Sequence, residues 1–93
     1  MPEFRVYVIE LRDGSLYVGS TAHPIRHRYA QHRAGVRLAA RACKRVGVRR
    51  LRPGLYKHLQ PFSNRVRAER EEGRLAYQLR QQGYRVHGGN LPL

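Results

Sequence analysis

Apolar residues gather in two short runs near the start of the chain, residues 5–11 and 15–20. Both runs are rich in valine, tyrosine and other residues that favour strands. The Asp13-Gly14 pair between them is a strong turn signal. The pattern therefore predicts a β-hairpin.

Loop length decides on which face of this hairpin the two central tyrosines, Tyr7 and Tyr17, are found. A two-residue loop at 13 and 14 would place them on opposite faces. A three-residue loop over 12–14, with Gly14 left-handed, would place them on the same face. We favour the longer loop because it places Val6, Val8, Leu16 and Val18 on one face and Tyr7, Ile9, Leu11 and Tyr17 on the other. Both faces of the hairpin are then largely apolar, so we expect the sheet to be covered on both sides.

Glycines and prolines divide the rest of the chain into shorter segments. We expect Pro24 to open a helix, and either Ser63 or Asn64 to cap a later, longer one. In order, the expected elements are a helix over 24–34, a helix over 36–46, a strand over 48–59 with a bend at Pro53-Gly54, a helix from 63 or 64 to just before Gly83, and a short strand in YRVHGGN. The order β-β-α-α-β-α-β predicts one α/β or α+β domain over residues 1–93. Its small mixed or antiparallel sheet starts with a β-hairpin and is flanked by helices.

Charge adds a candidate partner to this picture. Nineteen lysines and arginines face six acidic residues, for a net charge of +13, and all but two of the basic residues are arginines. Arginine's planar fork suits phosphate, so we expect the partner to be nucleic acid, most often DNA. The residues expected to bind its backbone are Arg26, Arg41, Lys44, Arg45, Arg49 and Arg50.

Other features of the composition restrict the class of protein. The single cysteine, Cys43, excludes an internal disulfide and a multi-cysteine zinc site, and it fits a reducing cytoplasm. No apolar run approaches the roughly 20 residues that a membrane helix needs, so no membrane role is expected. We see no signal peptide, and we expect a cytoplasmic protein.

The long helix carries one acidic residue where an apolar residue is expected. Its apolar stripe is Ala68, Leu75, Ala76 and Leu79. Glu72 falls inside this stripe, whereas Glu69 and Glu71 fall to its sides. A carboxylate that faces the core is costly unless it is paired or binds a cation. Glu72 is therefore a candidate metal ligand, with Glu69 as the alternative.

Four different short motifs stand along the chain. VYV stands at 6–8, YVG at 17–19 and RYAQHRAG at 28–35, and Glu72 has Ala68 before it and Leu75 after it. In these motifs the chain resembles the GIY-YIG nuclease superfamily. Its first triplet lacks the glycine and isoleucine of the family. The segment before Arg28 is one residue longer than in many small relatives, which leaves Arg26 as an alternative for the family's arginine.

The resemblance implies a metal-dependent endonuclease that hydrolyses phosphodiester bonds of DNA, in repair or processing. The implied catalytic residues are Tyr7, Tyr17, Arg28, His32, Glu72 and Asn90. Arg28 would bind the scissile phosphate, and Glu72 would hold one divalent cation, Mg²⁺ or Mn²⁺. Tyr7 would act as the base or position the water, with Tyr17 and His32 orienting it or relaying the proton. A tyrosine is a poor base near neutral pH, so either Arg28 or the cation lowers its pKa, or a cation-activated water acts instead.

A second reading is a non-catalytic nucleic-acid binding module on the same fold. It would explain the charge equally well, but not the presence of every expected catalytic residue type. A third reading, docking on an acidic protein, has no motif in its support. The oligomeric state and the preferred substrate stay open at this point.

Overall fold

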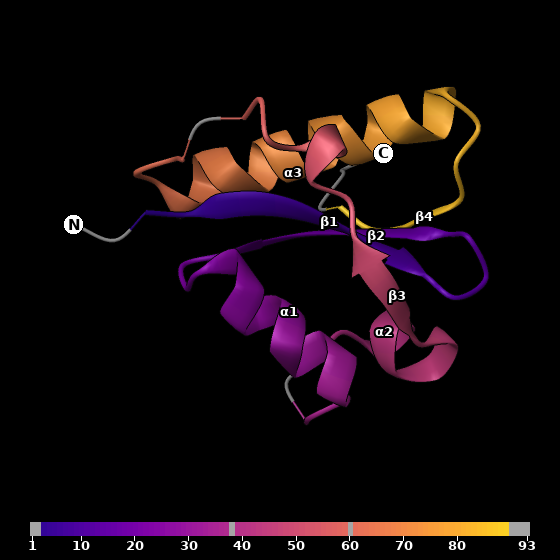
Figure 1. Cartoon of the computed structure of the whole chain (residues 1–93). Coiled ribbons are helices and arrows are strands. Elements are labelled where there is room, and N and C mark those ends of the chain that lie inside the picture. The colour runs from indigo at the N-terminus through magenta and orange to yellow at the C-terminus, as the bar shows by residue number, and fades with distance from the viewer. Residues whose placement is uncertain (1–2, 38, 60, 90–93) are drawn as a thin grey trace.

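The computed structural model describes residues 3–37, 39–59 and 61–89. Its elements follow the predicted order (Figure 1): β1 Arg5–Leu11, β2 Leu16–Thr21, α1 Ile25–Ala34, α2 Arg41–Val46, β3 Val48–Leu51, a 3₁₀ turn Pro53–Leu55, α3 Arg65–Gln81 and β4 Val86–Gly88. The predicted fold class, a small sheet flanked by helices, is confirmed.

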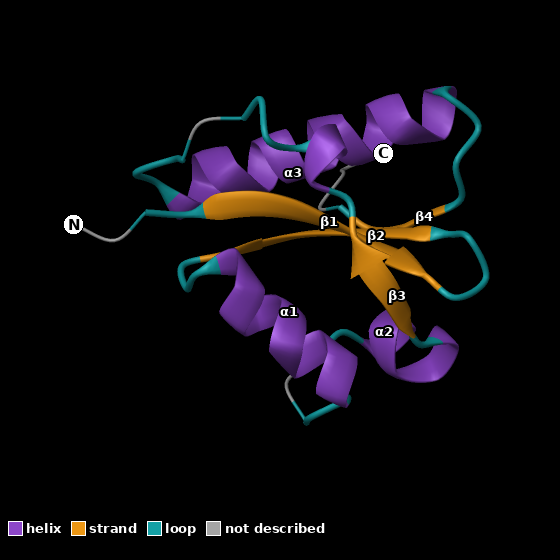
Figure 2. Ribbon diagram, viewed as in Figure 1, coloured by secondary structure: helices purple, strands orange, loops and turns teal. Residues whose placement is uncertain are grey.

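The four strands form one mixed sheet in the order β3-β1-β2-β4. β1 pairs antiparallel with β2 and β3, while β2 pairs parallel with β4. Helix α3 covers one face, and α1 and α2 lie on the other (Figure 2). A two-sided core explains why both faces of the hairpin are apolar in sequence.

The β1–β2 turn adopts the three-residue form. The Leu11 N–H donates to the Ser15 carbonyl at 2.8 Å. Gly14 closes the loop in the left-handed region, with φ of 85°, which glycine adopts readily because it has no Cβ. Ile9 consequently pairs with Tyr17, and since side chains alternate along β1, Tyr7 shares the face of Tyr17. The favoured register is confirmed.

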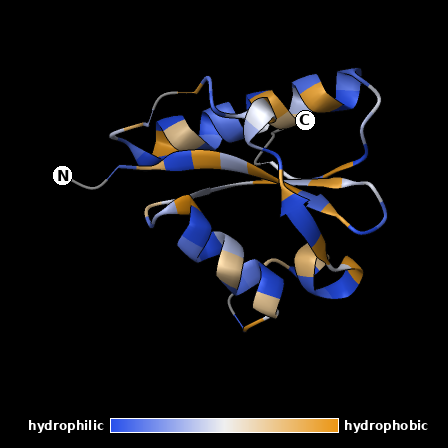
Figure 3. Ribbon diagram, viewed as in Figure 1, coloured by the Kyte–Doolittle hydropathy of each residue, from blue (hydrophilic) through white to orange (hydrophobic). Residues whose placement is uncertain are grey.

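Helix α3 packs its predicted stripe against the opposite face. Ala68, Leu75, Ala76 and Leu79 are all buried. Figure 3 shows apolar and hydrophilic residues alternating along α3, as expected of a helix with one buried side. No helix among the described residues is long and apolar enough to span a bilayer.

Several predicted boundaries are wrong. The second helix begins at Arg41 rather than at residue 36, because the Ala40 N–H donates to the His32 side chain and Ala40 itself is extended. The predicted strand over 48–59 ends at Leu51, since the 3₁₀ turn begins at Pro53, which has no N–H for a sheet. Pro24 occupies the cap of α1, one residue before the helix, and β2 ends at Thr21 rather than at residue 20.

Asn64 is the cap of α3. Its side-chain oxygen accepts from the N–H groups of Val66 at 2.7 Å and Arg67 at 3.3 Å. The predicted choice between Ser63 and Asn64 is thereby decided. These bonds satisfy two N–H groups that have no partner within the helix.

We predict that Asn64→Ala lowers the free energy of unfolding by about 1 kcal/mol, because both capping bonds are lost. Urea denaturation measures the change. Ser63→Ala is the matched control and should be nearly neutral, as its side chain is also exposed but the cap is held by Asn64. Equal losses in the two variants would contradict this assignment.

Candidate active site

Tyr7 is a deeply buried polar side chain on the α1 face of the sheet. It is 1% exposed, and its hydroxyl lies 2.8 Å from Nε2 of His32 on α1. Its neighbour across the hairpin is Gly19. A Cβ at position 19 would come within 2.7 Å of the Tyr7 hydroxyl. The glycine therefore leaves the space into which the Tyr7 ring extends.

Three rings meet on this face. The centroid of Tyr17 lies 6.2 Å from that of Tyr7 and 5.3 Å from that of His32, and Tyr7 and His32 are 5.8 Å apart. All three pairs are tilted, as aromatic rings prefer. Two strands and a helix thus contribute one side chain each to a compact cluster.

Hydrogen bonding fixes the tautomer of His32. The Ala40 N–H donates to Nδ1 of His32 at 3.0 Å. A backbone N–H can only donate, so Nδ1 carries a lone pair, and in the neutral ring the proton is on Nε2. His32 therefore donates from Nε2 to the Tyr7 oxygen. His32 orients Tyr7 and, in this state, has no lone pair directed at Tyr7 with which to take its proton.

Arg28 lies one helical turn before His32 and reaches the same tyrosine. Its guanidinium donates to Gln31 at 2.8 Å and also hydrogen-bonds to Tyr7. Burial, and next the charge of Tyr17, raise the pKa of Tyr7 above its usual range, although Arg28 opposes the rise. Of the alternatives left open by the sequence, lowering of the Tyr7 pKa by Arg28 alone is not supported, because desolvation outweighs the nearby guanidinium.

The pKa values of the other two rings shift for related reasons. Burial lowers the pKa of His32 to about 4, and the positive charge of Arg28 adds to the effect. Burial raises the pKa of Tyr17, as does the negative charge of Glu72. At neutral pH the cluster consists of two protonated tyrosines and one neutral histidine.

The negative charge of Glu72 acts on Tyr17, so this carboxylate lies within electrostatic range of the ring cluster. Glu72 is half-buried on α3, as are Glu69 and Glu71. The alternatives lie elsewhere: Glu71 pairs with Arg74 at 3.5 Å, and Glu69 lines a separate hollow next to Phe4. Among residues 3–37, 39–59 and 61–89, no three His, Cys, Asp or Glu side chains form a metal-binding group.

Two of the predicted site residues are not part of this cluster. Arg26 is exposed and lines a different hollow, with His23 and Tyr56, so Arg28 is the arginine that the fold brings to Tyr7. Asn90 lies outside the described residues.

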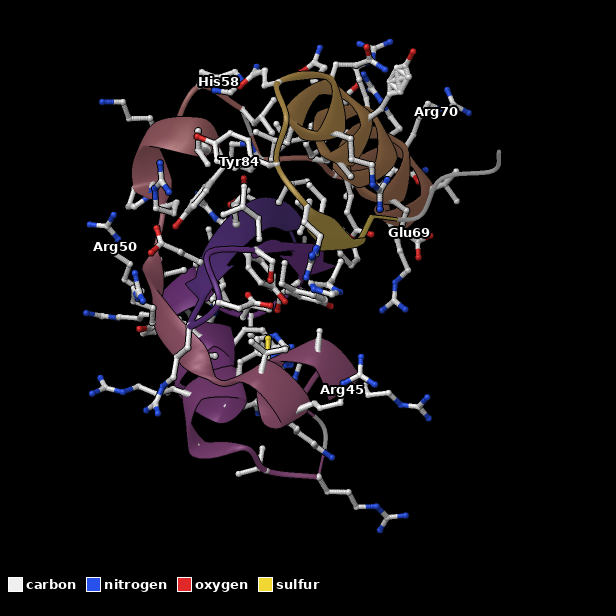
Figure 4. The ribbon with its side chains drawn as sticks, turned by 90° about the vertical axis from the view of Figure 1, so that its right-hand side faces the viewer. Arg45, Arg50, His58, Glu69, Arg70 and Tyr84 are labelled. Atoms are coloured by element: carbon white, nitrogen blue, oxygen red, sulfur yellow. The ribbon has the colours of Figure 1, made fainter. Side chains whose placement is uncertain are left out.

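A basic groove opens beside the cluster. It has a volume of about 890 Å³ and runs between the end of α1, α2 and the start of β3, with His32 in its wall. The cations that line it are Arg12, Arg33, Lys44, Arg45 and Arg49, and no carboxylate is among the described lining residues. Arg45, one of these cations, is labelled at the lower right of Figure 4. Arg41 is exposed on the first turn of α2.

Sequence reasoning missed several members of this region. Arg12 and Arg33 line the groove; Arg12 belongs to no motif, and Arg33 lies within RYAQHRAG but has no role assigned there. His87 pairs with Tyr17 across β4 and β2, and its Nε2 is buried with no hydrogen-bond partner among the described residues. The Ala40 N–H, which sets the His32 tautomer, has no sequence signal at all.

Comparison with known proteins supplies a family. A model of the GIY-YIG catalytic domain matches residues 3–85, nearly the whole chain. No curated protein and no solved structure matches it.

We predict that Gly19→Ala destabilises the fold by about 1–3 kcal/mol, the usual cost of overpacking a core. The new Cβ would lie 2.7 Å from the Tyr7 hydroxyl and 2.9 Å from the Tyr17 ring. Urea denaturation measures the loss. Gly54→Ala is the control, since a Cβ there meets nothing within 4 Å. If Gly19→Ala is as stable as the wild type, the close approach of the Tyr7 hydroxyl to Gly19 is contradicted.

We predict that His32 makes the fold less stable in mild acid. Its pKa is about 4 when folded and about 6.5 when unfolded, so between these values the unfolded chain binds more protons. The stabilisation is complete above about pH 6.5 and is lost as the pH falls towards 4, with a slope of up to about 1.4 kcal/mol per unit. Denaturation at several pH values measures it.

His32→Gln is the matched control for this titration. Glutamine can still donate to Tyr7 but has no charge to gain, so the difference in stability between the two proteins should narrow as the pH is lowered. Parallel stability profiles would contradict a His32 that is buried in its neutral form.

Proposed function

This chain belongs to the GIY-YIG catalytic domain family, and from that premise we propose that it is a metal-dependent endonuclease that hydrolyses phosphodiester bonds of DNA. The family implies nucleic-acid cleavage in general. The observation that supports it most for this chain is the convergence of Tyr7, Arg28 and His32 on one sheet face, with Glu72 within electrostatic range of Tyr17. A binding module does not need this arrangement.

In the proposed reaction Arg28 binds the scissile phosphate. The transition state of phosphodiester hydrolysis concentrates negative charge on the phosphate oxygens, and a guanidinium can donate two parallel bonds to them. The bond from Arg28 to Gln31 holds its side chain in the direction of the cluster. Rate acceleration then comes from a donor that is already oriented before the substrate arrives.

Tyr7 is proposed to position the attacking water. Its pKa lies above the usual range of tyrosine, which disfavours Tyr7 as the group that removes a proton from water in the resting enzyme. His32 and Arg28 both donate to its oxygen, so the hydroxyl is fixed in place. The ring of Tyr17 packs beside that of Tyr7, with centroids 6.2 Å apart, and completes the wall.

Glu72 is the residue proposed to hold a divalent cation, Mg²⁺ or Mn²⁺. Magnesium is usually held by one or two carboxylates and keeps several waters, so a single half-buried glutamate within electrostatic range of the cluster is a compatible ligand set. When bound through Glu72, the cation would supply Lewis-acid polarisation of the phosphate and stabilisation of the leaving oxygen. Asn90, which follows β4 in sequence, stays a proposed member of this site.

The basic groove is proposed to carry the nucleic-acid strand to the cluster. Its wall includes His32, and the cations along it are spaced from α1 to β3. Phosphates are the natural counterions of such a surface. Arg41 would extend this surface along α2, and Arg26 would contact the backbone at the other end of α1.

The wider role is also a proposal. We propose a single nuclease domain over residues 1–93 that acts in the cytoplasm in DNA repair or processing. A match to one family over nearly the whole chain supports the single domain. The buried free thiol of Cys43 is compatible with a reducing compartment. The non-catalytic binding module stays the second candidate, and cleavage assays separate the two.

We predict that Arg28→Ala and Glu72→Gln each reduce magnesium-dependent cleavage of plasmid by at least about 100-fold, the usual effect of removing one transition-state contact. Glu69→Gln is the matched control for Glu72→Gln and should cut normally. Arg26→Ala is the comparison for Arg28→Ala and should lose far less activity, because Arg26 would contact only the nucleic-acid backbone. Binding without metal should change little in Arg28→Ala, since only one of nineteen basic residues is lost. DNA binding without metal should stay equal or tighten in Glu72→Gln, because one charge that repels phosphate is removed.

The control variants also show whether the phosphate-binding arginine and the cation ligand are assigned to the correct residues. Loss of cutting in Arg26→Ala with a silent Arg28→Ala would move the phosphate site to Arg26. Loss in Glu69→Gln alone would move the cation ligand one turn along α3. If the wild type binds DNA but cuts none with Mg²⁺ or Mn²⁺, the binding module is the correct reading.

A further inference from the structure

The face of the sheet opposite the tyrosines carries a charged cluster that the proposed reaction does not use. Glu10 is the only acidic residue of β1 and is 6% exposed. It alternates with Ile9 and Leu11, so its side chain points away from the Tyr7 face. Arg50 pairs with it across β1 and β3. A carboxylate at such a site needs a partner, and it has three.

Three arginines converge on Glu10 from β3 and the residue after it. Oε1 of Glu10 accepts from Arg52 at 2.8 Å and from two nitrogens of Arg50 at 3.2 and 3.3 Å. Oε2 accepts from Arg49 at 3.3 Å. Burial opposes the charge of Glu10, but the bonds from Arg52 and Arg50 prevail and hold the pKa of this carboxyl below its usual range.

The cluster has more positive charge than its own structure requires. Three guanidiniums against one carboxylate leave an excess of two positive charges. The other acidic residue near this end of the hairpin, Asp13, is occupied by Arg85 at 3.9 Å. One arginine would have neutralised Glu10, so neutralisation does not explain the other two.

Two of the three arginines, Arg49 and Arg50, are exposed although they are paired with Glu10. The side chain of Arg49 is 55% exposed and that of Arg50 is 65% exposed. Arg49 also donates to the Arg12 carbonyl at 3.0 Å. A guanidinium carries several N–H donors in one plane, so bonds to Glu10 fix the plane while other donors still face solvent. Such donors bind an anion with little further loss of side-chain freedom.

We propose that Glu10 is a positioning residue that holds Arg49, Arg50 and Arg52 as a second phosphate-binding site, which takes the backbone of a nucleic-acid segment other than the one being cut. The proposal rests on the proposed function for the class of ligand. Arg49 also lines the basic groove, so it stands between the two surfaces at the β3 edge. In Figure 4, Arg50 lies on the opposite side of the view from Arg45 and Glu69.

The size of the molecule argues for two segments. Its longest dimension is 33 Å, about the length of one turn of B-DNA. A straight duplex of that length can lie along one face of the sheet but cannot follow both. The groove and the Glu10 cluster therefore require either two separate segments or one that is sharply bent.

The change in nucleic-acid affinity of Glu10→Gln distinguishes the positioning role from net charge, because the two predict changes in opposite directions. Net charge alone predicts that Glu10→Gln binds nucleic acid more tightly, because a negative charge is removed. The positioning role predicts weaker binding, on the order of 10-fold, because three side chains regain their freedom. Affinity is measured by fluorescence anisotropy in EDTA at several salt concentrations, with a labelled duplex of about 30 base pairs, roughly three helical turns.

Two control variants match the changes in charge. Glu3→Gln removes an exposed acid that pairs only loosely with Arg5, at 3.8 Å, and should bind as the wild type or slightly tighter. Arg50→Gln should lower the slope of log affinity against log salt by about 1, whereas Arg70→Gln, an exposed α3 position, should leave it nearly unchanged. Unfolding curves confirm that each variant is folded.

Stoichiometry tests the second segment directly. With a duplex of about 10 base pairs, one helical turn, calorimetry should give two bound duplexes per wild-type chain and one per Arg50→Gln chain. A single bound duplex in the wild type, or Glu10→Gln and Glu3→Gln variants of equal affinity, would overturn the proposal. All of these measurements are made without metal, so failure of the nuclease assignment in the plasmid assay leaves their outcome unaffected.

Discussion

One chain of hydrogen bonds holds the candidate active site together: the Ala40 N–H donates to His32, and His32 donates to Tyr7. It joins the backbone before α2, a side chain of α1 and a side chain of β1. Because the Ala40 N–H is used in this way and Ala40 is extended, α2 begins only at Arg41. Because Nδ1 of His32 accepts, the ring stays neutral and donates to Tyr7. The direction of one backbone bond thus determines how the proposed catalytic tyrosine is held.

Charge is divided between the two faces of the sheet. On the α1 face, burial is stronger than the influence of Arg28, so the tyrosines keep their protons and the histidine stays neutral. On the other face, a buried carboxylate organises guanidiniums that remain largely exposed. The first arrangement suits the positioning of one phosphate and one water. The second suits a backbone that is held but not cut.

The sequence predicted what depends on local geometry. The position of Gly14 gave the hairpin register, and helical spacing brought Arg28 and His32 to one face and distinguished Glu72 from Glu71. The missed features depend on contacts between distant segments. Nothing near Glu10 in sequence indicates that its partners are forty residues away on β3. The raised pKa of Tyr7 depends on how deeply the assembled sheet buries it, which no motif records.

The tautomer of His32 tests this account most directly. Heteronuclear NMR of protein labelled with ¹⁵N at histidine reports which ring nitrogen carries the proton and which nitrogen accepts a hydrogen bond. At neutral pH the account predicts a neutral His32 with its proton on Nε2, and with Nδ1 accepting a bond from a backbone amide. A ring protonated on Nδ1, or on both nitrogens, would contradict it, because His32 could then no longer accept from Ala40 while donating to Tyr7.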